Sequence, residues 1–187
     1  MNTIDSKQFR VLAIAPVTRG FGFAVLEGQD TLVNWGVKVV SGKGNKNAKL
    51  LPKVEELIAH YQPDVLVMED ASAKGSLRRS RIQRLVPQII KVAKASKANV
   101  KLFSREQVMK LLVPDGQGTK HDLAEIVAGE FPEQLGSKLP PKRTAAMREN
   151  YQMGIFDAVG LVMVVRLKQA MLYLPSTNPP ATSSIFQ

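Results

Sequence analysis

The sequence predicts an α/β domain built on a five-stranded mixed sheet with helices on both faces. Three short segments rich in β-forming residues, 11–14, 21–26 and 31–40, follow one another with only short, glycine-containing turns between them. Consecutive strands joined in this way pair antiparallel, so the opening of the chain predicts a β-meander. Two further apolar runs, 65–68 and 100–103, alternate with helical patterns, which is typical of buried parallel strands.

Helical patterns fill the segments around the last two strands. Apolar residues recur at helical spacing, and Ser104 with Gln107 three residues later has the form of a capping box. The polar stretches 41–49 and 134–144 are expected to be loops. The expected helices cover 51–61, a basic stretch that ends near 98, a segment that begins after Ser104, 122–130 and 147–172.

The length of the chain fits one domain. Its 187 residues are 44% apolar, which is enough for a hydrophobic core, and no internal repeat is visible. We expect a single domain over 1–187 with its core at about 10–172. The ends, 1–9 and 173–187, are expected to be flexible tails.

The charge balance points to a polyanionic partner. Lys and Arg number 26 against 16 Asp and Glu, a net charge of +10. Basic side chains displace counterions from phosphate backbones, so nucleic acid is a candidate partner, beside the alternative of a basic surface without a ligand. The absence of Cys excludes disulfides, thiolate zinc sites and a cysteine nucleophile. No apolar run reaches the ~20 residues that span a bilayer, and no signal peptide is visible, so we expect a cytoplasmic protein without a membrane partner.

A basic stretch follows the fourth expected strand, and no acidic residue occurs between 74 and 101. This pattern favours a phosphate-binding stripe over a merely solvated helix face. Arg19, in the first turn of the meander, and Lys120 are further candidates. The candidate nucleic-acid-binding residues are Arg19, Lys74, Arg78, Arg79, Arg81, Arg84 and Lys120.

Four segments, taken in order, resemble the RuvC-type Holliday-junction resolvases of the RNase H-like superfamily. The segment VLAIAPVTRGFGFAVL is similar to the first hairpin of that family, in which an apolar strand ends in Asp-Pro-Gly-Ser-Arg. PDVLVMED resembles the strand that ends in a catalytic Glu, here Glu69. FSREQVMKLLVPDGQGTKHDLAEIV resembles the glycine-bearing loop and basic helix start, with Lys120 at a DNA-contacting position. GIFDAVGLVMVV resembles the helix that carries the last catalytic Asp, here Asp157.

The resemblance covers roughly residues 10–168 and implies an RNase H-like fold. It also implies two Mg²⁺ or Mn²⁺ ions bound by converging carboxylates, with Glu69 and Asp157 as metal ligands and catalytic residues. A role in DNA recombination and repair, a four-way DNA junction as substrate and a homodimer follow from the same resemblance. The family's junction-wedging aromatic residue has no counterpart in the stretch DASA after Glu69.

Two of the four expected ligands are missing. Position 15 is Ala where the family has its central Asp, and position 154 is Gly where the family has His or Asp. Asp70 can contribute only if its strand ends or bulges at Glu69, because successive strand residues point to opposite faces. Ala15 is either natural or an engineered Asp replacement, and Gly154 favours natural degeneracy because one designed change does not explain both gaps.

Three hypotheses follow. The leading one is a RuvC-like protein that binds branched DNA and has weak or absent metal-dependent nuclease activity, with or without a bound ion. The second is an active junction endonuclease that uses Glu69, Asp70 and Asp157 with Mg²⁺ or Mn²⁺. The third is a non-enzymatic assembly module that uses the fold without a nucleic-acid partner.

Overall fold

The computed structural model describes residues 8–74, 76, 78–144, 147 and 150–173 of the chain. The strands are β1 (Arg10–Val17), β2 (Gly20–Glu27), β3 (Thr31–Val39), β4 (Val65–Glu69) and β5 (Asn99–Phe103). They form one sheet in the order β3-β2-β1-β4-β5. The first three strands pair antiparallel, whereas β4 runs parallel to both β1 and β5. The expected five-stranded mixed sheet is therefore confirmed.

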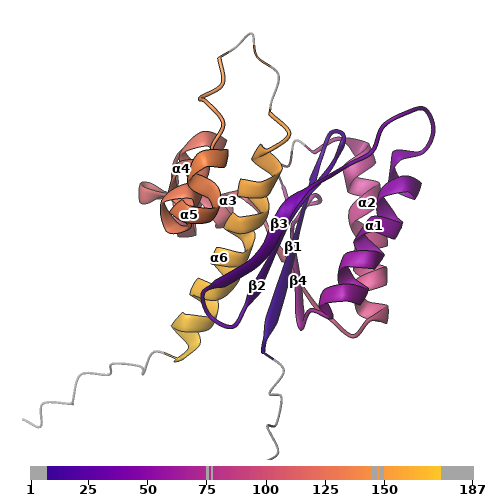
Figure 1. Cartoon of the computed structure of the whole chain (residues 1–187), viewed down its shortest axis with the longest axis horizontal. Coiled ribbons are helices and arrows are strands. Elements are labelled where there is room, and N and C mark those ends of the chain that lie inside the picture. Colours follow the sequence, from indigo (N-terminus) through magenta and orange to yellow (C-terminus); the bar gives the residue numbers. More distant parts are fainter. Residues whose placement is uncertain (1–7, 75, 77, 145–146, 148–149, 174–187) are drawn as a thin grey trace, which may run out of the picture.

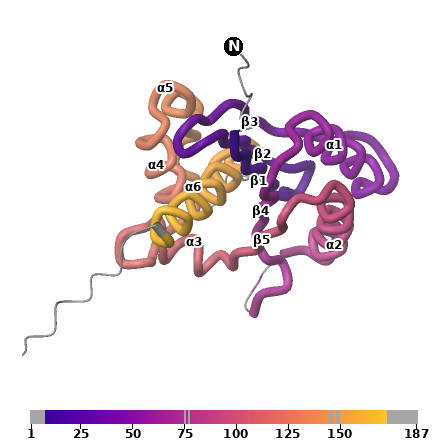
Figure 2. The backbone as a smooth tube through the Cα atoms, turned by 90° about the horizontal axis from the view of Figure 1, so that it is seen from below, coloured from indigo at the N-terminus to yellow at the C-terminus, as the bar shows by residue number. Residues whose placement is uncertain are grey.

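Helices cover both faces of the sheet (Figure 1). One face carries α1 (Lys46–Tyr61) and α2 (Ser80–Ala95), and the view in Figure 2 shows the same separation of the two layers. Two short 3₁₀ turns lie at Pro114–Gly116 and Gly136–Lys138. The helices on the other side are α3 (Arg105–Leu112), α4 (Lys120–Glu130), α5 (Pro132–Leu135) and α6 (Met153–Tyr173).

The alternation of side chains along β1 separates two hydrophobic cores. Leu12 and Ile14 belong to the core under α1 and α2, where most of the residues are large. Ala13 and Ala15 belong to the opposite core, under α6. Because the side chains of these alanines are short, α6 can lie close to the middle of the sheet.

The approach of α6 to the sheet is tightest at two glycines. A Cβ atom on Gly22 of β2 would lie 1.9 Å from the carbonyl oxygen of Gly154, which is shorter than any real contact. On the other side of the contact, a Cβ atom on Gly154 would lie 3.1 Å from Val17 Cγ1 and 3.2 Å from Gly22 N. The first turn of α6 therefore rests on the backbone of β2, and no side chain fits between them.

Two helix boundaries differ from the sequence-based expectation. The first helix begins at Lys46 rather than at residue 51, because Asn45 Oδ1 accepts hydrogen bonds from the backbone N–H of Asn47 and Ala48 and caps it. The last helix begins at Met153 rather than at residue 147.

Smaller differences lie around α4. It begins at Lys120 rather than at residue 122, since Thr119 is its cap and Asp122 completes the capping box. The expected loop after it instead begins with α5 and a 3₁₀ turn. The expected flexible tails lie outside the described residues, apart from Gln8, Phe9 and Tyr173.

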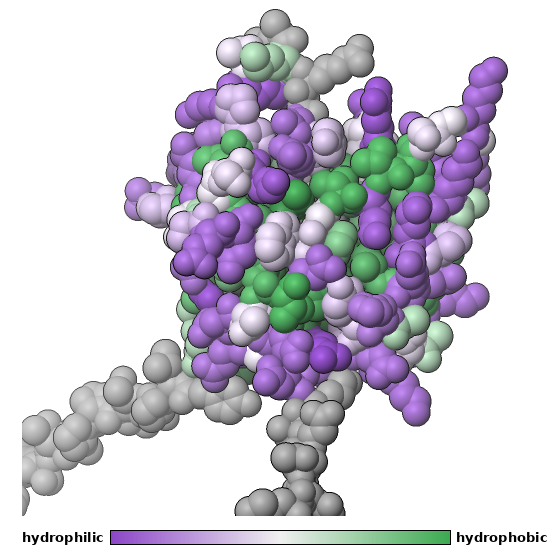
Figure 3. Space-filling model, viewed as in Figure 1, coloured by the Kyte–Doolittle hydropathy of each residue, from purple (hydrophilic) through white to green (hydrophobic). Residues whose placement is uncertain are grey.

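The surface carries mainly hydrophilic side chains on the face drawn in Figure 3, with hydrophobic residues in separate patches between them. Among the helices of the described residues, none combines the length and the hydrophobicity that a bilayer-spanning segment needs. The long apolar helix α6 instead buries most of its residues in the core against the sheet.

The contact between Gly22 and Gly154 gives a testable prediction. The substitution Gly22→Ala forces α6 away from β2 and is expected to lower the free energy of unfolding by about 3 kcal/mol, as overpacking does. Urea denaturation measures the change. The control is Gly129→Ala in α4, where an added Cβ meets nothing within 4 Å and helix propensity favours Ala. A loss below about 0.5 kcal/mol for Gly22→Ala would contradict the packing argument.

Candidate functional site

The positions singled out in the sequence gather where β1 and β4 end, on the face covered by α6. Ile14 of β1 is in register with Met68 of β4, so the next residues, Ala15 and Glu69, lie side by side on the opposite face. Asp157 lies on α6 in the helical turn after Gly154, which packs on the end of the β1–β2 hairpin. The fold therefore brings these positions together at one end of the sheet.

Glu69, the last residue of β4, is held by an arginine of the same chain. Arg78 Nε lies 2.8 Å from Glu69 Oε1, and Arg78 Nη2 lies 2.5 Å from Oε2. Both side chains are less than one fifth exposed, at 18% for Arg78 and 14% for Glu69. The third nitrogen, Nη1, donates to the carbonyl of Pro16 at 3.5 Å. Both carboxylate oxygens thus accept a fork-like pair of charge-assisted hydrogen bonds.

Asp157 is held by two cations. It is only 6% exposed, and Arg105 Nη1 at the start of α3 donates to its Oδ1 at 3.3 Å. Lys120 Nζ at the start of α4 lies 2.7 Å from Oδ2, in an ion pair without the geometry of a regular hydrogen bond. From the sequence Lys120 is predicted to contact DNA. Arg105 is not predicted to lie at the site, because a pairing across 52 residues leaves no local pattern.

These residues do not fit a two-metal centre. Such a centre needs several converging carboxylates with free oxygens, because Mg²⁺ takes hard oxygen ligands in octahedral geometry. Ala15 offers no ligand, and Gly154 has no side chain; a Cβ atom there would make a tight contact of 3.2 Å with Gly22 N. The two carboxylates that remain, Glu69 and Asp157, each face basic groups of this chain.

Asp70 is engaged in the turn that follows β4. The strand ends at Glu69, as the hypothesis for Asp70 required. Asp70 Oδ1, however, accepts hydrogen bonds from the backbone N–H of Ser72 at 2.9 Å and from Ser72 Oγ at 2.7 Å. Both hydrogen bonds lower the pKa of Asp70 below its ordinary value, and the hydrogen bond from the Ser72 hydroxyl has the larger effect. Metal binding by this carboxylate would have to compete with the turn.

Arg81 is also used inside the protein. Its Nη2 donates to the carbonyl of Val17 at 2.7 Å, and its Nη1 donates to Asn47 Oδ1 at 2.9 Å. The side chain of Asn47 in turn donates to the carbonyl of Arg81 at 3.0 Å. Burial lowers the pKa of Arg81, and the nearby charge of Arg79 lowers it further. Arg81 therefore joins the β1–β2 turn to the first turns of α1 and α2.

Four of the basic candidates are exposed around this junction of elements. Arg19 lies in the β1–β2 turn that Arg81 holds, and Arg79 immediately precedes α2. Arg84 follows one turn along the helix, and Lys74 lies in the segment between β4 and α2. The first turn of α2 contains no acidic residue, so its N-terminal dipole adds to the positive charge. A positive surface thus borders the end of the sheet where Ala15 and Glu69 lie.

A second cluster, of metal-ligand residue types, lies at the start of α4. Ligand atoms of His121, Asp122 and Glu125 lie within 4.8 Å of one another. Asp122 completes the capping box of α4, and His121 Nε2 is 3.0 Å from the carbonyl of Pro140. Hydrogen bonds with Thr119 lower the pKa of Asp122, and the one from the backbone N–H of Thr119 has the largest effect. The intrachain contacts give His121 and Asp122 structural roles.

Comparison with solved structures confirms the fold. The RuvC structure of Thermus thermophilus aligns with a TM-score of 0.65 at 16% identity, covering 87% of this chain and 96% of that one. The chain has the RuvC fold. T. thermophilus RuvC in complex with a Holliday junction substrate aligns with a TM-score of 0.63 at 14% identity, over 87% and 96% of the two chains.

The yeast mitochondrial Holliday junction resolvase Ydc2 has the same fold, with a TM-score of 0.62, 16% identity and coverage of 88% of this chain and 80% of that one. By sequence, the chain matches no protein-family model and no curated protein. The likeness to the RuvC fold is therefore one of three-dimensional structure. The ion pairs of Glu69 and Asp157 occur on that shared scaffold.

The pair Glu69–Arg78 gives a second prediction, tested by a double-mutant cycle of Arg78→Met and Glu69→Gln. Each single change leaves a mostly buried partner uncompensated and is expected to cost about 2 kcal/mol of unfolding free energy. The double variant should cost less than the sum, with a coupling energy of about 1–2 kcal/mol from urea denaturation.

The matched control is the fork-like pair of Arg10 and Glu27, whose side chains are more exposed at 31% and 22%. Because solvent screens it more strongly, its coupling energy should be nearer to about 0.5 kcal/mol. Additive effects of Arg78→Met and Glu69→Gln would show that the two side chains do not stabilise one another.

Proposed function

We propose that this chain, acting as one domain, binds branched DNA of the four-way-junction type and does not cleave it by metal-dependent hydrolysis. The observation that carries the proposal is the pairing of both retained carboxylates with cations of the same chain, on a RuvC scaffold. A catalytic centre of that type needs carboxylates that share divalent ions. Here Arg78, Arg105 and Lys120 take the place of those ions as the positive charges beside Glu69 and Asp157.

The charge of the surface supports DNA as the partner. The net charge is +10, and Arg19, Lys74, Arg79 and Arg84 expose their side chains near the end of the sheet. Phosphate contacts from such residues bind any DNA backbone, whereas the arrangement of the backbones in a junction decides preference. T. thermophilus RuvC, which has this fold, forms a complex with a Holliday junction substrate.

The proposal includes a cytoplasmic setting, a role in recombination or repair, and a homodimer. A four-way junction has two-fold symmetry, so two copies related by the same symmetry can each contact an equivalent pair of arms. Light scattering of the protein alone and with a junction measures the stoichiometry. Two protein chains for each junction are expected, and a single chain at saturation would contradict the dimer.

Binding without metal is tested by titrating a labelled four-way junction, a duplex and a single strand in EDTA and in Mg²⁺. We expect the junction to bind most tightly, with similar affinity in both buffers. If the four exposed cations of each chain contact one phosphate apiece, the slope of log K against log salt should be roughly −3.6 for each bound chain. Weak, salt-insensitive binding to all three DNAs would reject DNA as the partner and favour the assembly module.

The contribution of the exposed basic residues around the start of α2 to DNA binding is tested with the double variant Arg79→Ala/Arg84→Ala. Removal of two phosphate contacts from each chain should reduce the steepness of the salt slope by about 1.8 for each bound chain. The control Lys110→Ala/Lys138→Ala removes the same charge from exposed positions on the α6 side of the sheet. Equal effects of the two double variants would show that net charge alone, rather than this surface, governs binding.

Cleavage is tested by incubating the junction with excess protein in Mg²⁺ or Mn²⁺. No product is expected from the wild-type chain, nor from Ala15→Asp, because position 154 still lacks a ligand and both carboxylates remain paired. Circular dichroism shows whether Ala15→Asp folds. Cleavage by the wild-type chain would overturn the proposal, and cleavage only by Ala15→Asp would identify that carboxylate as the one missing component.

A further inference from the structure

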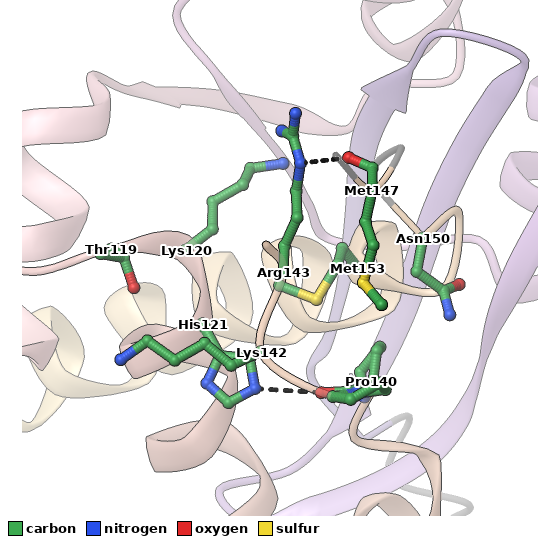
Figure 4. A pocket seen from close by; sticks show the side chains of 10 residues that line it. Thr119, Lys120, His121, Pro140, Lys142, Arg143, Met147, Asn150 and Met153 are labelled. Atoms are coloured by element: carbon green, nitrogen blue, oxygen red, sulfur yellow. Dashed lines mark hydrogen bonds between the residues drawn. The ribbon is translucent and has the colours of Figure 1, made fainter. Parts of the chain in front are cut away.

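A cavity of about 490 Å³ lies beside the candidate site, between the start of α4 and the segment that leads into α6. Its volume is within the range of roughly 300–1,000 Å³ typical of small-molecule sites. The imidazole of His121 lies against the carbonyl of Pro140 and links the two walls (Figure 4). This cavity is separate from the exposed surface around the start of α2, which lies across the sheet.

One part of the cavity is apolar. Pro140, Pro141, Met147 and Met153 contribute rings and flexible thioether chains to its lining. Pro140 and Met153 are buried, so their part of the wall is fixed by packing, whereas Pro141 is exposed and Met147 is half exposed at the rim. Methionine side chains adapt their shape to flat ligands and make favourable sulfur–aromatic contacts. A planar aromatic group of modest size suits such a wall.

The other part of the cavity is cationic. Lys120, Lys142 and Arg143 line it, and Lys142 is largely exposed. Arg143 Nε donates to the carbonyl of Met147 at 2.6 Å, which positions the guanidinium at the rim (Figure 4). The carboxylate of Asp122 is 3.9 Å from Lys142 Nζ, a distance at which the lysine can turn to an incoming anion. The paired positive side chains favour phosphate or carboxylate.

We propose that this cavity binds one nucleotide, with its base against the proline and methionine wall and its phosphate between Lys142 and Arg143. A nucleotide joins a planar apolar group to an anion, which is the combination that the two parts of the lining complement. The ligand is either a free nucleotide or an unpaired nucleotide of a DNA strand. Only the second source rests on the proposed DNA-binding function.

Lys120 connects this cavity to the candidate site. It lines the cavity and at the same time forms the ion pair with Asp157. A phosphate that draws Lys120 toward the cavity leaves Asp157 with Arg105 as a remaining partner. Occupancy of the cavity can therefore change the charge beside Asp157 without leaving a buried carboxylate unpaired.

The experiment has a free-ligand arm and a DNA arm. In the first, 2-aminopurine riboside monophosphate, 2-aminopurine riboside and inorganic phosphate are titrated by fluorescence or calorimetry. The nucleotide should bind at least about tenfold more tightly than either fragment, because only it uses both parts of the lining. Lys142→Ala/Arg143→Ala should weaken it by about tenfold, whereas the control Lys91→Ala/Lys94→Ala on α2 should leave the affinity within about twofold.

In the DNA arm, the 2-aminopurine is an unpaired nucleotide in a four-way junction. Its fluorescence should change on binding to the wild-type chain and change less with Met147→Glu, which adds a negative charge at the rim. A signal in this arm alone assigns the site to DNA, and a signal in the free arm alone assigns it to a free nucleotide.

If the junction binds but neither arm responds to the cavity variants, the cavity proposal is overturned while the proposed function stands. If the junction itself does not bind, it is the proposed function that fails, and the free-ligand arm still decides the cavity.

Discussion

The close contact between α6 and β2 determines how the rest of this end of the molecule is built. Gly22 and Gly154 bring two backbones together where any side chain would separate them. The same contact accounts for the small residues Ala13 and Ala15 on the α6 face of β1, since larger ones would lift the helix. It also sets Asp157, in the next turn of α6, at a fixed depth below the surface. A glycine at position 154 therefore suits the packing, because a Cβ atom there would make tight contacts of 3.1–3.3 Å with Val17 and Gly22.

The ion pairs bear directly on the chemistry open to Glu69 and Asp157. A buried carboxylate is costly unless a positive charge accompanies it, and a metal ion and a basic side chain are two ways of meeting that need. In this structure, basic side chains accompany both Glu69 and Asp157. Arginine and lysine supply charge and hydrogen bonds, but they do not generate a hydroxide from water as a divalent ion does. This difference separates recognition of a phosphate backbone from its hydrolysis.

Much of the fold could be predicted from the sequence because it is written in local patterns. Short β-rich runs, helical spacing and the cap at Ser104 identify the five strands, and five of the six α-helices, that the described part of the chain contains. The errors occur where local signals conflict. Pro52, inside α1, disfavours the interior of a helix, yet the cap at Asn45 starts the helix at Lys46, five residues before the expected start at residue 51. Apolar Met147 suggested an early start for α6, but that residue lies in the segment that forms the cavity.

The candidate site was predicted in outline but not in its contacts. The positions of Ala15, Glu69, Gly154 and Asp157 follow from the order of motifs, and the structure brings them to one end of the sheet. Their partners do not follow, because Arg105 and Asp157 are 52 residues apart and only the folded chain joins them. Arg81 shows the same limit. In the sequence it is one more basic residue of a stripe, whereas in the structure its donors are directed into the protein.

The position of Arg81 has a consequence for the rate at which a partner can associate with this surface. Because it ties the β1–β2 turn to α1 and α2 at once, the backbone that carries Arg19 and Arg79 is already ordered before any ligand arrives. Among the described residues around Arg19 and Arg79, no backbone has to fold during an encounter, so the cost of association there is restricted to side chains and displaced ions. A rigid, positively charged edge of this kind can be guided to a polyanion by its long-range field, with a rate limited by diffusion and orientation rather than by conformational change.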